Sequence, residues 1–176
     1  MPSLYTYLIS SLPLLNFLGK PTLDFDKFVS LCARFIPLSD LEIIKNVSVS
    51  TEFKSQRLPV TLKKWQDFDT ALRNELVKIR SSRKHVDPSK YLKPLFFPDL
   101  SLSHAVASIV RNPSLLEVEK ALDLLRWRFL DEISFGHYFD LELLIIYALK
   151  LQILIRWENI GQLDKEKIME TTLAAY

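Results

Sequence analysis

Five acidic and histidine side chains gather in one short stretch, and their types suit metal binding or acid–base chemistry. The stretch reads RWRFLDEISFGHYFDLELLIIYALKLQILIRW, and the five residues are Asp131, Glu132, His137, Asp140 and Glu142. Metal ligands on one helical face stand three or four residues apart. Only His137 and Asp140 have that separation, because Glu132 and His137 are five residues apart with Gly136 between them. The spacing therefore predicts neither a metal site nor a catalytic pair.

A structural role explains the same charges better. Asp140 stands where it can cap a following helix, and Glu142 falls in the first turn, where negative charge is favoured. Gly136 permits a turn before them. The stretch is thus expected to form a helix, a turn and a second helix. A small metal-dependent or acid–base enzyme that uses the Asp131–Glu142 cluster stays open as an alternative.

Composition limits the other kinds of chemistry. The chain has 176 residues, 48% hydrophobic and 25% charged, which is typical of a folded protein. Its three glycines stand alone, so no glycine-rich phosphate loop is predicted. The single cysteine, Cys32, excludes a disulfide framework and a cysteine-based zinc site, and it is expected to be buried. We predict no cofactor.

Basic residues concentrate between Lys78 and Lys93. We predict a partner-binding surface made of Arg73, Arg80, Arg83, Lys84 and Lys90. A helical protein that binds nucleic acid through Lys78–Lys93 is the alternative, but the net charge of +2 is too small to imply it and no aromatic RNA motif accompanies the stretch.

Apolar periodicity predicts the elements that carry these residues. We expect an all-α, or nearly all-α, single domain over residues 1–176 with about six helices, and the N-terminal segment as a candidate short strand. Ser48–Pro59 is expected to be a loop. Two helix caps are predicted at Ser39 and Asp164. The helices are predicted at 21–36, 38–47, 61–80, 96–112, 113–135, 138–158 and 164–175. Helix 61–80 is predicted to bury one apolar stripe and to carry Asn74 on its opposite, polar face, and helix 113–135 is predicted to bury a second stripe. The first stripe consists of Leu62, Trp65, Phe68, Leu72, Leu76 and Ile79, and the second of Leu115, Val118, Leu122, Leu125, Phe129 and Ile133.

The most apolar segment, Leu141–Trp157, has 13 apolar residues in 17. A membrane-spanning helix needs about 20, and a charge at its centre is costly there. Lys150 occupies that central position. We therefore predict the central helix of the core, or one that also faces a partner. The aromatic side chains in and before it are expected in the core, namely Trp127, Tyr138, Tyr147 and Trp157.

Three blocks carry a resemblance to a known family. They are YTYLISSLPLL near the N-terminus, WQDFDTALRNELVKIRSSR in the middle, and LDLLRWRFLDEISFGHYFDLELLIIYALKLQILIRW near the C-terminus. Together they resemble a bacterial family of unknown function whose genes lie in V-type ATP synthase operons. Members are often longer between the first two blocks, where this chain is short around Ser48–Pro59.

That family is distantly similar to the connector of V-type ATPases that is called C in bacteria and d in eukaryotes. This connector is all-helical, has no catalytic residues, and seats the central stalk on the membrane ring. The resemblance implies a non-catalytic, cytoplasmic part of a V-type ATP synthase at the inner face of the membrane. Its implied partners are the stalk and ring subunits, with no nucleic acid and only indirect membrane contact.

Overall fold

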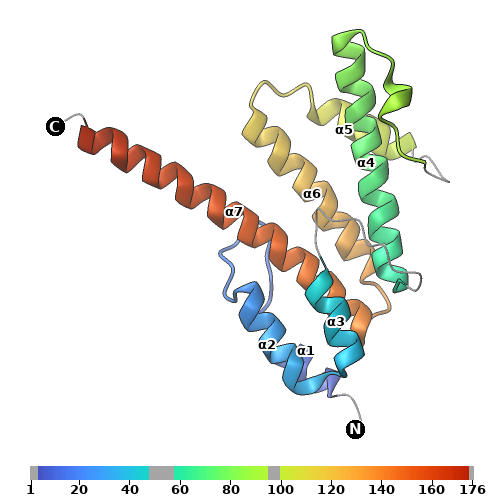
Figure 1. Cartoon of the computed structure of the whole chain (residues 1–176), viewed down its shortest axis with the longest axis vertical. Helices are drawn as coiled ribbons and strands as arrows, with labels where there is room; N and C mark the ends of the chain where they lie inside the picture. The colour runs from blue at the N-terminus through green and yellow to red at the C-terminus, as the bar shows by residue number, and fades with distance from the viewer. Residues whose placement is uncertain (1–3, 48–57, 95–99, 175–176) are drawn as a thin grey trace. The chain divides into compact units, whose positions relative to one another are not determined.

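The computed structural model describes residues 4–47, 58–94 and 100–174, without the side chains of Leu100 and residues 163–174. These residues form seven α-helices and one short 3-10 helix, with no strand among them, which confirms the all-α prediction (Figure 1). They belong to two compact units, Met1–Phe53 with Ser134–Tyr176 (unit 1) and Lys54–Ile133 (unit 2). We describe each unit by itself, and the single domain predicted for residues 1–176 stays a prediction.

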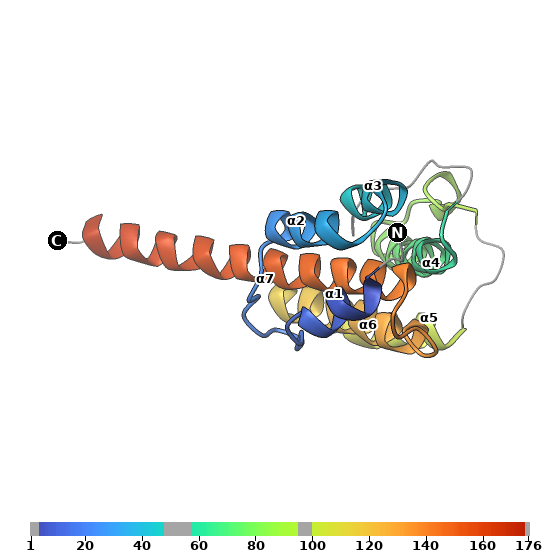
Figure 2. The same cartoon turned by 90° about the horizontal axis from the view of Figure 1, so that it is seen from below.

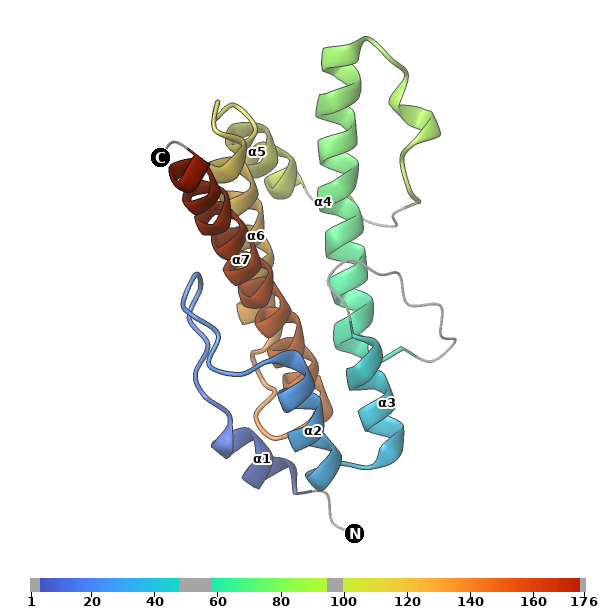
Figure 3. The same cartoon turned by 60° about the vertical axis from the view of Figure 1, so that its left-hand side comes forward.

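Unit 1 packs three short helices on one long one. Helices α1 (Tyr5–Ser11), α2 (Phe25–Phe35) and α3 (Leu38–Asn46) accompany α7 (Leu141–Ala174). Helix α2 contacts the other three, and α3 also packs on α7. Both lie along the first half of α7, which continues past them (Figure 2 and Figure 3).

The buried centre of unit 1 is the first half of α7. Eight apolar side chains between Leu144 and Leu154 are almost fully buried, which confirms the predicted core role of Leu141–Trp157. No helix in the described part of the chain is long and apolar enough to cross a bilayer. The predicted break before Asp164 is wrong, since α7 runs through it for 34 residues. No proline interrupts this segment, and a single glycine such as Gly161 is tolerated inside a helix.

The N-terminal segment is a helix, so its candidate strand is wrong. Tyr5, Tyr7 and Ile9 alternate as in a strand, but Leu8 is the fully buried residue and Tyr7 is 63% exposed. Tyr5 and Leu8 instead share one helical face. The Tyr5 hydroxyl donates to the Asp40 carboxylate of α3. Burial and this carboxylate raise the pKa of Tyr5 well above its ordinary value. These contacts select the helix.

Helix α3 begins differently from the prediction. It starts at Leu38 after Pro37, so Ser39 lies inside its first turn and is not the cap. The Ser39 hydroxyl donates to the Asp40 side chain instead. Pro37 is itself extended, with ψ 152°, and its carbonyl accepts the first bonds of the helix from the N–H groups of Asp40 and Leu41 at 3.1 and 3.0 Å. Residues 48–57 of the predicted loop Ser48–Pro59 lie outside the described residues.

Unit 2 is built on α4 (Val60–Lys84), followed by the 3-10 helix η1 (Pro88–Lys90), α5 (Leu100–Ile109) and α6 (Leu115–Ile133). Helix α4 contacts the other three, and α5 contacts α6. The predicted stripe of α4 is confirmed, because Leu62, Trp65 and Leu72 are buried. The first residue of the predicted α6 stripe, Leu115, is 74% exposed, so that position is wrong.

Aliphatic side chains from α4, α5 and α6 meet in one core cluster in unit 2. Beside this cluster the rings of Phe68 and Phe129 stack with centroids 4.1 Å apart. The buried members of the cluster are Ala71, Leu72, Leu102, Val106, Val118 and Leu122.

Candidate functional site

The histidine–carboxylate pair of the opening stretch caps a helix. Asp140 Oδ1 accepts from the backbone N–H of Leu143 at 3.0 Å, which is the bond expected of an N-cap residue. Its other oxygen lies 2.5 Å from His137 Nδ1. Gly136 has φ +89°, in the region that favours glycine. The predicted turn and cap are both confirmed.

The remaining members of the cluster do not converge on a reaction centre. Asp131 and Glu132 are exposed in the last turn of α6, and Glu142 lies in the first turn of α7. Within the residues that the structure describes, no three His, Cys, Asp or Glu side chains gather as metal ligands would. The enzyme alternative therefore receives no support from the geometry of the described cluster.

The turn between α6 and α7 instead presents aromatic rings. Phe135 is 88% exposed, Tyr138 65% and Phe139 52%. We call these three residues the aromatic turn. The prediction that Tyr138 lies in the core is wrong, because most of its side chain is exposed to solvent. Exposed aromatic side chains next to each other are typical of contact surfaces between proteins.

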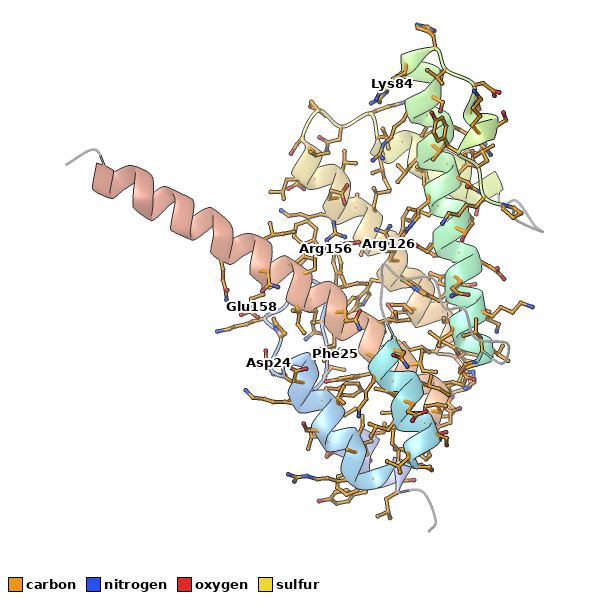
Figure 4. All side chains as sticks on the ribbon, in the orientation of Figure 1. Asp24, Phe25, Lys84, Arg126, Arg156 and Glu158 are labelled. Atoms are coloured by element: carbon orange, nitrogen blue, oxygen red, sulfur yellow. The ribbon has the colours of Figure 1, made fainter. Side chains whose placement is uncertain are left out.

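The structure divides the predicted basic surface into engaged and exposed cations. Arg73 pairs with Asp69 at 2.6 Å, and Arg83 donates to the carbonyl of Val110 at 3.0 Å. Arg80, Lys84 and Lys90 are exposed and make no ion pair with any residue the structure describes. Figure 4 shows Lys84 near the end of α4. The five predicted residues therefore do not form one set of exposed cations, because Arg73 is paired within α4 and Arg83 is bonded to the carbonyl that follows α5.

The exposed cations Arg80 and Lys84 line a groove at the end of α4. Its volume is about 340 Å³, and the segment that follows α4 supplies its second wall. We call it the α4 groove. Its lining residues are Val77, Arg80, Ser81, Lys84, Val86 and Tyr91.

The chain that forms the second wall is held at two places. At its start His85 takes φ +53°, and the N–H groups of His85 and Val86 donate to the carbonyls of Ser82 and Ser81. This is the Schellman arrangement that closes a helix C-terminus. Further on, the Asp87 carboxylate accepts hydrogen bonds from the hydroxyl and from the N–H of Ser89. Both bonds lower the pKa of Asp87, and the hydroxyl has the larger effect.

Asn74 holds the far end of this wall. Its side-chain oxygen accepts from the N–H of Lys93 at 3.0 Å, and its amide donates to the carbonyl of Lys93 at 2.9 Å. Asn74 is only 8% exposed, although its position predicts the polar face of the helix. That prediction is wrong because the chain that returns after α4 covers Asn74. Its partner Lys93 is 19 residues away in the sequence, and helical periodicity carries no information about such a contact.

Glu75 joins α4 to α5 next to Asn74. It accepts from Lys78 at 2.6 Å and from the Ser103 hydroxyl at 2.8 Å. Burial acts to raise the pKa of Glu75, but these two donors outweigh it and the pKa is lowered. Lys78 is thus also paired with a carboxylate. The unpaired positive charge near this end of α4 therefore comes from Arg80 and Lys84.

A buried charge network ties α4 to α6 in unit 2. Arg126 Nε lies 3.1 Å from Asp69 Oδ1, and Arg126 Nη1 lies 2.8 Å from Asp123 Oδ1. The Asp123 side chain is fully buried and that of Arg126 is 10% exposed. Helical spacing would pair the arginines of α6 with Asp131 and Glu132. Arg126 instead bonds to Asp69, which is 57 residues away in the sequence, so only the tertiary fold brings the two side chains together.

Unit 1 has an apolar pocket of about 260 Å³ between the N-terminal segment and α7. Its lining is mostly leucine and isoleucine, with Lys150 as the one cation among the lining residues that the structure describes. The Tyr147 hydroxyl donates to the carbonyl of Pro13 at 3.1 Å across it. Burial raises the pKa of Tyr147 to about 12. This bond fastens the segment after α1 to α7 and gives the pocket a structural role.

Comparison with known proteins gives one similarity. A family model described as "Protein of unknown function (DUF2764)" matches residues 96–172, a little less than half of the chain. The matched residues include α5, α6 and nearly all of α7, and therefore the aromatic turn. No curated protein and no solved structure matches the chain significantly.

Proposed function

We propose that this protein is a non-catalytic accessory component of a bacterial V-type ATP synthase, similar to the C (or d) connector, and that it acts by docking to other subunits. The resemblance of the three sequence blocks supports the link to the synthase. The third block, residues 122–157, also lies within the segment that matches the family of unknown function.

The observation that carries the docking role is the aromatic turn. In this part of the third block His137 and Asp140 cap a helix, while Phe135, Tyr138 and Phe139 face solvent. Aromatic side chains bring large contact area for little conformational entropy, and they are enriched where proteins meet. The basic end of α4 offers a second, electrostatic contact.

This role places the protein at the cytoplasmic face of the membrane, within the complex. Its partners there are the central stalk and the membrane ring, and it contacts the bilayer only through them. It needs no cofactor and no nucleic acid. Ion transport by the complex depends on it as a connector, because a rotary machine requires its stalk to be seated on its ring.

Co-purification tests this function. Tagged protein expressed from its own gene is expected to retain the A, B and D subunits of the synthase, and removal of the gene is expected to lower proton-coupled ATPase activity. A clean purification that lacks all three subunits refutes the proposal.

The contribution of the aromatic turn is tested in the same assay. Phe135→Ser with Phe139→Ser is expected to reduce the retained subunits, because these rings are 88% and 52% exposed and do not build the core. Leu38→Ser with Leu115→Ser is the matched control, since these apolar side chains are also well exposed, at 77% and 74%. Equal losses from both pairs would remove the aromatic turn from the docking surface.

A further inference from the structure

Positive charge is segregated in this chain. Residues 78–93 hold six Lys and Arg against one Asp, a net +5, whereas the whole chain carries +2 and the other residues therefore carry −3. A local excess of this size attracts acidic surfaces and steers their approach. The remaining negative charge repels a long polyanion. The distribution favours a short acidic partner segment over nucleic acid.

Within this segment the α4 groove concentrates the exposed charge. Arg80 and Lys84 both line it and stand four residues apart, which places their side chains as neighbours about 6 Å apart on one helical face. Val77 and Val86 give the same groove aliphatic walls, and the ring of Tyr91 is 60% exposed beside them. Charge and apolar surface are thus presented together.

The groove is formed before any partner arrives. Asn74, the Schellman closure at His85 and the Asp87–Ser89 bonds hold the returning chain against α4. A wall that is already ordered reduces the entropy that binding must offset. Such preorganisation is what a recognition groove requires, and a solvated connection between helices does not need it.

We propose that the α4 groove binds an extended acidic peptide segment of a protein partner, in which two carboxylates on one face pair with Arg80 and Lys84 of α4. The apolar side chain between them points to the opposite face of the peptide and packs against Val86 and Tyr91 of the second wall. Carboxylates with this separation occur two residues apart in an extended peptide, where side chains on one face repeat about every 6.6 Å. The inference rests on the proposed function only in that both require docking to another protein.

Nucleic acid is the less suitable ligand for this groove. Bases are bound by stacking on several aromatic or guanidinium planes along a basic track. Among the lining residues that the structure describes, the groove has one aromatic ring and two cations, and two valines supply its aliphatic surface. An apolar peptide side chain fits such walls better than a base does.

Binding of a synthetic peptide to the purified chain tests the proposal without any other component of the synthase. The probe is a fluorescein-labelled Gly-Ser-Glu-Leu-Glu-Phe-Glu-Ser-Gly peptide, measured by fluorescence anisotropy at low salt. One control peptide has Gln at every Glu position, and a second has Ser at the Leu and Phe positions. The probe is expected to bind more tightly than either control, and its affinity is expected to fall as salt rises.

Arg80→Ala with Lys84→Ala is expected to lower the affinity of the chain for the probe about tenfold, or ~1.4 kcal/mol, because two exposed ion pairs are lost. The matched control is Lys63→Ala with Lys64→Ala, which removes the same charge from exposed positions at the start of the same helix. Those positions lie about 24 Å along the axis from Arg80. The control is expected to change the affinity less than twofold.

Tyr91→Ala tests the apolar half of the site. It is expected to lower the affinity for the probe and to leave the affinity for the Ser-substituted control peptide unchanged, because of these two peptides only the probe places an apolar side chain beside the ring. Tyr91 is largely exposed, so its loss does not unfold unit 2.

Several results overturn the proposal. The first is that the probe does not bind at low salt, and the second is that the Gln peptide binds as tightly as the probe. The third is that the Lys63 and Lys64 control variant loses as much affinity as the Arg80 and Lys84 variant. The fourth is that a labelled uridine oligonucleotide binds more tightly than the probe and also requires Arg80 and Lys84. The last result would establish nucleic acid as the ligand. Peptide binding without co-purified synthase subunits would instead refute the proposed function and leave the groove intact.

Discussion

Replacement of Arg126 by methionine is expected to lower the free energy of unfolding of unit 2 by about 3 kcal/mol. Arg126 makes two charge-assisted hydrogen bonds, at 3.1 Å to Asp69 and 2.8 Å to Asp123. Its loss leaves the fully buried Asp123 carboxylate without that cation. Removal of one partner from a buried pair costs about 3–5 kcal/mol. The lower value is expected because Asp69 keeps its bond to Arg73.

Urea unfolding measures this effect, followed by tryptophan fluorescence. In a Trp157→Phe background the emission comes from Trp65 and Trp127, both buried in unit 2. A loss of about 3 kcal/mol moves the unfolding midpoint by roughly 1–3 M urea for a typical dependence on denaturant. The control is Arg128→Met, an exposed arginine on the same helix, which is expected to change stability by less than about 0.5 kcal/mol.

A second substitution separates charge from packing. Addition of Asp123→Asn to Arg126→Met removes the stranded charge but keeps a hydrogen-bonding side chain, so it is expected to restore about 1–2 kcal/mol. If Arg126→Met costs no more than Arg128→Met, or if Asp123→Asn lowers stability further in that background, the network does not hold α4 to α6 as described.

Three further outcomes follow from the same geometry. His85→Gly is expected to raise thermal stability by ~0.5–1 kcal/mol because glycine has no Cβ to strain at φ +53°, and a lower melting temperature would contradict this. Asp140→Ala is expected to cost about 1 kcal/mol in urea unfolding through loss of the bond from Leu143, whereas Asp140→Asn keeps a capping oxygen and costs less. Burial raises the pKa of Cys32 from 9.0 and of Tyr147 from 10.0, each to about 12. Their neutral forms therefore favour folding at low pH, and this stability is expected to be lost between about pH 9 and 12. Urea unfolding across this range measures it, and stability that is flat to pH 12 would count against the burial of both groups.

Local patterns predicted much of the helical framework. The α4 stripe of Leu62, Trp65 and Leu72 was readable because burial of a helix face repeats every three to four residues. The Asp140 cap and the Gly136 turn were readable because both depend on groups within three residues. The same locality explains the failure at the N-terminus, where seven residues of α1 satisfy a strand period and a helix period equally well.

Folding alone decided which polar side chains are engaged and which are exposed. Asn74 and Arg73 have similar neighbours in sequence, but Asn74 is buried under Lys93 while the Arg73 side chain remains 42% exposed. Arg126 finds Asp69 across 57 residues, and Arg80 becomes part of a groove only because the chain turns back at His85. A charged side chain has no sequence period that reports its partner, since pairing depends on the path of the chain between the two residues. Local spacing therefore predicted where charge accumulates, and the tertiary contacts determined which of those charges another molecule can reach.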